Sequence, residues 1–72
     1  MILATIQAYD DQPVLTLAYD PATYILSATS ADGSVAEDVG PLFPVVEEAI
    51  SYIYDSYYLG WNLTWNENAA SF

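Results

Sequence analysis

The chain has 72 residues, ten carboxylates and no Lys, Arg or His, which gives a formal net charge of −10 at pH 7. A chain without basic side chains cannot neutralise phosphates or anchor on anionic lipids. The composition therefore excludes direct nucleic-acid binding and a Lys/Arg-anchored amphipathic membrane helix. Because 54% of the residues are apolar and no cysteine is present, we expect one small domain over residues 1–72 with a packed core and no disulfide.

The first half of the chain predicts three β-strands joined by short turns. Residues 2–9, 14–19 and 23–30 are rich in apolar, aromatic and β-branched residues, and the second and third of these segments alternate apolar and polar positions. Residues 10–13 and 20–22 contain Asp and Pro, which favour chain reversal. Short turns between successive strands are typical of an antiparallel meander.

The second half predicts a loop, one helix and a last strand. Residues 35–43 contain Gly40 and Pro41 and are read as a loop, and Pro44 is expected at the first helical position because its fixed φ suits that position. Residues 61–66 alternate as a fourth strand, and residues 67–72 are expected to form a loose tail. The apolar residues of the helix share one face: Val46, Ala49, Ile50, Ile53 and Tyr57.

The predicted order is β-β-β-α-β, an α+β fold in which an antiparallel sheet is covered on one face by one helix. If the loop stays at the end of the sheet where the third strand finishes, the helix begins at that end. Eight of the ten carboxylates would then gather at or near one end, and only Asp20 and Asp55 would lie elsewhere.

The residue types present argue against catalysis and against a metal site. Without His, Cys or Lys, the usual general base, thiol nucleophile and Schiff-base amine are missing, and the adjacent acids are read as solvated turn and helix residues. An EF-hand loop built around Gly33 would place Ala28 and Val39 at its first and last ligand positions, where neither can bind calcium. We therefore expect no enzymatic activity, no metal and no cofactor.

Acidic and aromatic side chains together predict a protein-recognition surface. Aromatic residues are enriched at interfaces, and on the helix Tyr52 and Tyr58 flank an acidic face. Packing of these two tyrosines into the core or a dimer seam is an equal alternative, whereas Tyr54 is expected in the core. The predicted partner-binding residues are Asp10, Asp11, Asp32, Glu37, Asp38, Glu47, Glu48, Asp55, Tyr52 and Tyr58.

In size and charge the whole chain resembles the small acidic phage proteins that imitate DNA, which include anti-CRISPR proteins, anti-restriction proteins and uracil-DNA glycosylase inhibitors. Residues 15–20 are also similar to a hairpin of the glycosylase inhibitors, although here the helix follows the strands. The resemblance implies an inhibitor in the cytoplasm of a bacterial host cell, with the anti-CRISPR type favoured. Its partner would be the basic nucleic-acid-binding site of a Cas subunit, a restriction enzyme or a DNA-repair enzyme, with no membrane involved.

Other functions stay open at this point. An antitoxin, an immunity protein or an assembly subunit would use its acidic charge to complement one specific basic protein, without imitating DNA. Adaptation to high salt also produces acidic surfaces, but as an explanation it is placed below nucleic-acid imitation and below a dedicated acidic partner. An enzyme that uses paired carboxylates is placed last. Formation of a homodimer through an edge strand is likewise left open.

Overall fold

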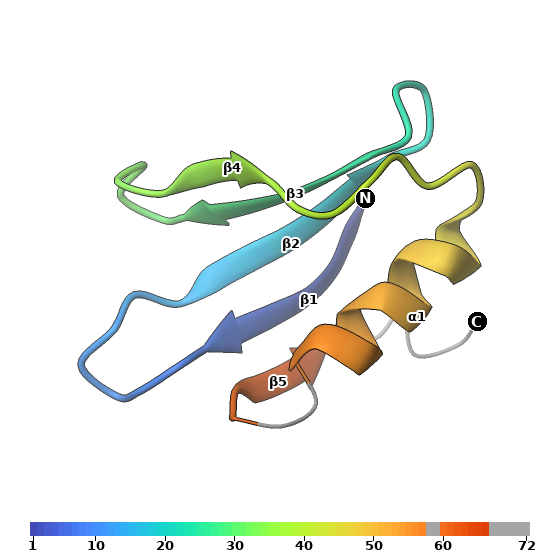
Figure 1. Cartoon of the computed structure of the whole chain (residues 1–72). Helices are drawn as coiled ribbons and strands as arrows, with labels where there is room; N and C mark the ends of the chain where they lie inside the picture. The colour runs from blue at the N-terminus through green and yellow to red at the C-terminus, as the bar shows by residue number, and fades with distance from the viewer. Residues whose placement is uncertain (58–59, 67–72) are drawn as a thin grey trace.

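The computed structural model describes residues 1–57 and 60–66, and it shows an α+β fold with a five-stranded antiparallel sheet and one helix (Figure 1). The strand order across the sheet is β4-β3-β2-β1-β5. The predicted α+β class and the meander of the first three strands are confirmed. The elements follow in the order β1 (Ile2–Gln7), β2 (Leu15–Asp20), β3 (Ile25–Ser30), β4 (Ala36–Asp38), α1 (Val46–Tyr57) and β5 (Asn62–Trp65).

The core lies between the sheet and α1, and the alternation of the strands produces it. Ala4 of β1 lies opposite Leu17 of β2, which lies opposite Ala28 of β3, so their side chains point to the same face of the sheet. Ala49 and Ile53 of α1 pack onto that face with no exposed surface. The buried apolar residues of this cluster are Leu3, Ala4, Ile6, Leu17, Tyr19, Leu26, Ala28, Val39, Phe43, Ala49 and Ile53.

Strand β4 is the main departure from the predicted topology. The expectation of a loop over residues 35–43 is wrong at Ala36–Asp38, which pair antiparallel with β3 through Ala28↔Glu37 and its neighbours. This short edge strand carries the chain back along β3. Residues 39–43 therefore reach the opposite end of the sheet, where the Val39 N–H donates to the Leu26 carbonyl at 2.7 Å.

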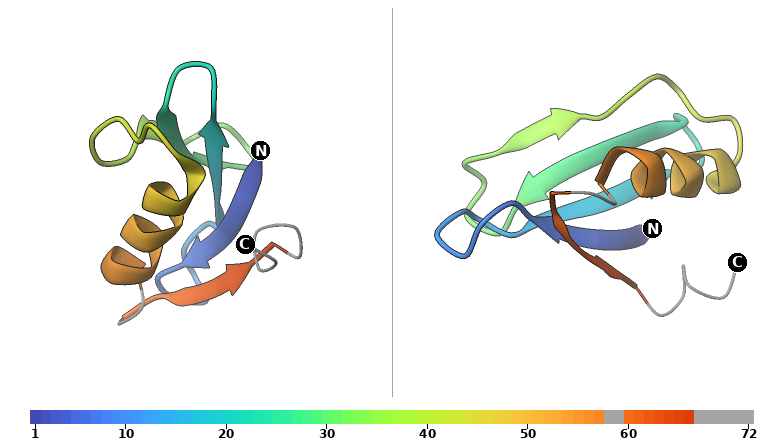
Figure 2. Two further views of the ribbon diagram at one scale, coloured as in Figure 1. Left: turned by 90° about the vertical axis from the view of Figure 1, so that its right-hand side faces the viewer. Right: turned by 60° about the horizontal axis from the view of Figure 1, so that its bottom comes forward.

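The helix begins at Val46, two residues later than the predicted start at Pro44. The backbone of Phe43 is held by β2 and by the turn before β3, because its N–H donates to the Tyr24 carbonyl at 2.8 Å and its carbonyl accepts the Tyr19 hydroxyl. These bonds fix the chain beside the sheet, and Pro44 and Val45 then turn it into the helix. The helix covers one face of the sheet (Figure 2).

The opposite face of the sheet, which we call the open face, is uncovered by the described residues (Figure 2). Four threonines lie side by side across it, because Thr5 pairs with both Thr16 and Thr64, and Thr16 pairs with Thr29. Two carboxylates of the described strands share this face, because Asp38 lies opposite Ser27 and Asp20, at the end of β2, lies opposite Ile25. The open face therefore carries a row of threonines with one acid on its edge strand and one at its end.

Candidate functional site

The carboxylates of the described residues all reach solvent. Every acidic residue except Glu67 falls within the described residues, and each of these nine is exposed. Since the chain contains no Lys, Arg or His, none of them has a basic side chain as a partner within the chain. The nine exposed acids are Asp10, Asp11, Asp20, Asp32, Glu37, Asp38, Glu47, Glu48 and Asp55.

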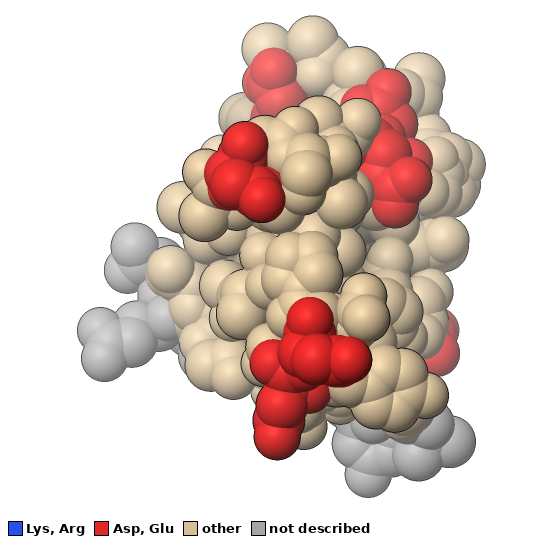
Figure 3. Space-filling view, turned by 90° about the vertical axis from the view of Figure 1, so that its left-hand side faces the viewer, with Lys and Arg blue, Asp and Glu red and all other residues tan. Residues whose placement is uncertain are grey.

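The predicted gathering of eight carboxylates at one end of the sheet is wrong. Asp10, Asp11 and Asp32 do lie together at one end, in the turns that follow β1 and β3. Glu47 and Glu48 lie at the opposite end, because β4 reverses the chain before α1 begins. Figure 3 views the end with Asp10, Asp11 and Asp32, and its acidic side chains form separate groups divided by uncharged surface.

The remaining acids occupy the middle and the far end of the molecule. Asp20 ends β2 at the end where α1 begins, while Asp55 lies in the last turns of the helix. Glu37 and Asp38 alternate on β4, so Glu37 points to the helix-covered side and Asp38 to the open face. The acids are thus spread over the length of the domain.

Asp32 has a structural role within its turn. One carboxylate oxygen accepts hydrogen bonds from the Ser34 N–H at 3.0 Å, the Ser34 hydroxyl at 2.7 Å and the Ser30 hydroxyl at 2.7 Å. These donors lower the pKa of Asp32 to about 2. Asp20 is similar, since its carboxylate accepts the Ala22 N–H at 2.9 Å and this bond lowers its pKa. Both acids shape turns as well as contributing charge.

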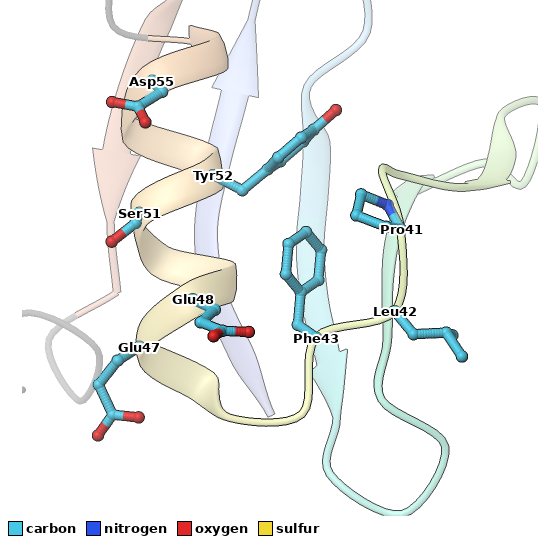
Figure 4. A pocket seen from close by; sticks show the side chains of 8 residues that line it. All are labelled: Pro41, Leu42, Phe43, Glu47, Glu48, Ser51, Tyr52 and Asp55. Carbon is cyan, nitrogen blue, oxygen red and sulfur yellow. The ribbon is translucent and has the colours of Figure 1, made fainter.

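A groove of about 450 Å³ runs along α1 beside the segment that leads into it (Figure 4). In Figure 4, Glu48 and Tyr52 extend from α1 toward Phe43 and Pro41, while Ser51 lies on the outer side of the helix. The groove therefore combines apolar walls with an acidic rim. Its lining residues are Pro41, Leu42, Phe43, Glu47, Glu48, Ser51, Tyr52 and Asp55. We call this site the acidic–aromatic groove.

Gly40 fixes the position of the Tyr52 ring in this groove. Gly40 has φ +69°, and a Cβ atom added there would lie 2.9 Å from Cζ of Tyr52 and 3.2 Å from Cζ of Phe43. The rings of Tyr52 and Phe43 are themselves in contact, with centroids 5.3 Å apart and an interplanar angle of 55°. The aromatic wall is thus packed directly against the backbone.

The charges around the groove affect a buried phenol beneath it. Burial is the largest cause that raises the pKa of Tyr19, and nearby acidic groups, among them Asp20, Glu48 and Glu47, add to the shift. The Tyr19 hydroxyl donates to the Phe43 carbonyl, so this phenol supports the floor of the groove while it stays protonated.

The tyrosines on α1 divide between core, groove and surface. Tyr52 is half-buried: it lines the groove and also packs against the core cluster, so its position fits both alternatives that the sequence left open. Tyr54 is 49% exposed, so its expected place in the core is wrong. Tyr57 packs edge-on against Trp61 with ring centroids 5.2 Å apart. Tyr58 lies outside the described residues.

Sequence reasoning missed the residues that face α1 across the groove. Pro41, Leu42 and Phe43 fall in the segment that was read as a loop, and the hydrogen bonds of Val39 and Phe43 to β3 and its preceding turn place them. These are contacts between distant parts of the chain. The pattern of residues 35–43 holds no signal for them.

Neither a metal centre nor a membrane-crossing helix is found in the described part of the chain. Within residues 1–57 and 60–66, His, Cys, Asp and Glu form no group of three or more that could hold a metal ion. The helix there is too short and too polar to cross a bilayer. No protein-family model, curated protein sequence or solved structure matches the chain.

Proposed function

We propose that this protein is an inhibitor that acts by binding, without catalysis, at the basic nucleic-acid-binding site of another protein. One observation carries the proposal: nine exposed carboxylates cover a domain that has no basic side chain to compensate them. Such a surface attracts a groove lined with Lys and Arg and steers association with it. Any added Lys or Arg would weaken this attraction.

The overall density of charge, counted over all sides of the domain, is of the order of that of a single nucleic-acid strand. The domain measures 34 Å along its longest axis. Its nine described carboxylates therefore average one per about 3.8 Å of that length, close to the ~3.4 Å per charge of one DNA strand and about half the density of a duplex. We propose a target that holds a single strand, or one strand of a duplex, in a basic channel.

The class of target follows from the resemblance in size and charge to phage inhibitors. We propose a bacterial defence or DNA-processing protein in the cytoplasm, such as a Cas subunit, a restriction enzyme or a DNA-repair enzyme, and an anti-CRISPR role above the others. A protein of this kind presents a basic surface that evolved to bind phosphates, and carboxylates can occupy the same positions.

The acidic–aromatic groove favours a second candidate, a dedicated acidic partner of one basic protein, such as an antitoxin or an immunity protein. Aromatic residues beside apolar side chains are typical of interface hot spots, where a few residues carry most of the binding energy. The two candidates differ in one respect. An imitator of nucleic acid competes with DNA or RNA for its target, and a dedicated partner need not.

A capture experiment with a nucleic-acid elution step tests the proposal. The protein is immobilised, exposed to nuclease-treated bacterial lysate at low salt and washed. Bound proteins are then eluted at the same ionic strength with a single-stranded oligonucleotide, and in a parallel column with an uncharged peptide. Elution of a nucleic-acid-binding protein by the oligonucleotide alone is the expected result. A matched column carries Glu47→Gln, Glu48→Gln and Asp55→Asn.

The outcomes separate the two candidates. A captured protein that the oligonucleotide releases, and that the variant column binds less well, supports imitation of nucleic acid. A captured protein that the oligonucleotide does not release, and that elutes only at high salt, supports the dedicated-partner candidate. Capture of no protein above the level of a neutral control column contradicts both candidates.

A further inference from the structure

We propose that the acidic–aromatic groove binds one arginine side chain of the basic partner, an inference that rests on the proposed function and assigns it a site. The groove lies between α1 and residues 41–43, and about 450 Å³ is a volume typical of sites for small ligands and single side chains. Its place beside the first turn of α1 leaves it open to an approaching surface (Figure 4).

The walls of the groove suit the aliphatic part of an arginine. Pro41 and the half-buried Tyr52 supply apolar surface, Phe43 is almost buried at 5% exposed, and Leu42, which also lines the groove, is 62% exposed. Long basic side chains bury their methylene groups on such surface while the charged group reaches a polar partner. A compact metal ion would gain nothing from these walls.

The rim of the groove suits the guanidinium group. Glu48 extends toward Phe43, and Glu47 and Asp55, which point to the other side of the helix in Figure 4, add negative charge along α1. A planar guanidinium can pair with a carboxylate through two parallel hydrogen bonds and can also contact an aromatic ring. Lysine offers a smaller, more strongly hydrated charge without that planar shape, so we infer a preference for arginine.

Two other hollows on the surface combine these features less well. One of about 320 Å³ contains Trp61 but a single carboxylate, Glu37. Another of about 250 Å³ contains Asp38 and no aromatic ring. Of these three hollows in the described part of the chain, the groove along α1 is the one that combines several carboxylates with two aromatic rings.

The groove is also organised before any partner arrives. The Tyr52 ring rests on Gly40, whose backbone leaves no room for a Cβ atom, and Phe43 is held by backbone bonds to Tyr24 and by the Tyr19 hydroxyl. A site whose walls are already fixed loses little conformational entropy on binding. This rigidity favours recognition of one side chain over a loose attraction between charges.

Titration of the ¹⁵N- and ¹³C-labelled protein with Nα-acetyl-arginine amide tests the proposal without any partner protein. We expect saturable shift changes in the millimolar range at Phe43, Glu48 and Tyr52, with changes at least about threefold smaller for Nα-acetyl-lysine amide. Glu48→Gln should remove saturation. Asp11→Asn makes the same change in net charge at a distant turn, and it should leave the titration unchanged.

The result that overturns the proposal is a set of small, non-saturating shifts spread equally over all the carboxylates, or equal effects of Glu48→Gln and Asp11→Asn. The spectra of the variants report folding directly, so a collapsed variant is recognised as such. Failure of this titration together with oligonucleotide-sensitive capture would leave the proposed function standing and remove only the groove as its arginine site.

Discussion

The two faces of the sheet differ in cover and in the company of their acids, although the same strands build both. The helix-covered side carries Glu37, Glu47, Glu48 and Asp55 together with the aromatic wall of the groove. The open face carries a row of threonines and, among the described strands, two acids, Asp20 and Asp38. Acids and aromatic rings are combined only on the helix-covered side of the described residues, and this difference supports the proposal that this side binds the partner.

The largest expected effect is a difference in stability between two single substitutions in β2. They lie at adjacent residues whose side chains point to opposite faces of the sheet. Leu17 is fully buried under α1, so Leu17→Ala should lower the free energy of unfolding by about 2–5 kcal/mol. Thr16 points to the open face, and Thr16→Ala should cost less than about 1 kcal/mol. Urea denaturation of the two variants measures the difference. Equal losses would contradict the assignment of the core to one face.

Neutralising acids on one side should change binding far more than neutralising acids elsewhere. Glu47→Gln, Glu48→Gln and Asp55→Asn together should weaken binding of a fluorescent hepta-arginine peptide by about tenfold or more. Asp10→Asn, Asp11→Asn and Asp38→Asn remove the same formal charge and should weaken it only about twofold to threefold. Fluorescence anisotropy at constant ionic strength makes the comparison. Equal weakening would show that only net charge matters.

Raising the salt concentration should stabilise the domain, because its carboxylates repel one another and the chain has no basic side chains to attract them. Between about 0.02 M and about 0.3 M NaCl, screening should raise the unfolding free energy by about 1 kcal/mol. The triple variant on the helix-covered side should gain less from salt than Asp38→Asn. Thermal unfolding checks both statements, and a melting temperature that falls with added salt would contradict them.

The smallest effect concerns the pH dependence of the turn after β3. The pKa of Asp32 is about 2 in the folded protein and below its ordinary value of 3.8, so its stabilising contribution is present above about pH 4. That contribution is lost as the pH falls toward 2. NMR titration should therefore show that Asp32 takes up its proton only as the pH approaches about 2, and Asp32→Asn should remove this part of the acid dependence. A pKa of Asp32 near its ordinary value of 3.8 would contradict the role of its hydrogen bonds in this turn.

The sequence alone predicts which face of the sheet a strand side chain occupies, but it does not predict at which end of the sheet α1 begins. Alternation predicts the buried side chains of β2 and β3, because β-strand side chains alternate regardless of topology, but it fails at Tyr24, which lies in the turn before β3 and is 44% exposed. The direction of α1 depends on β4, whose three residues are all exposed and show no alternation. Only pairing with Ser27, Ala28 and Thr29 makes that segment a strand, and this contact is not encoded within the segment itself.

The same limit applies to the candidate site. The helix positions of Glu47, Glu48, Tyr52 and Asp55 follow from the 3.6-residue period, and the groove contains all four. Its opposite wall comes from residues 41–43, which reach α1 only because β4 carries the chain to that end of the sheet. Half of the groove was therefore predictable, and half depended on tertiary pairing.

The most direct test of the central claim is a displacement assay with a partner recovered by capture. A fluorescent single-stranded oligonucleotide is bound to that partner and titrated with the wild-type protein, with the variant Glu47→Gln, Glu48→Gln and Asp55→Asn, and with an open-face variant, Thr29→Gln and Thr64→Gln. The account predicts complete displacement by the wild-type protein and the open-face variant, and displacement by the helix-side variant only at about tenfold higher concentration. Displacement lost in the open-face variant and retained in the helix-side variant would contradict it.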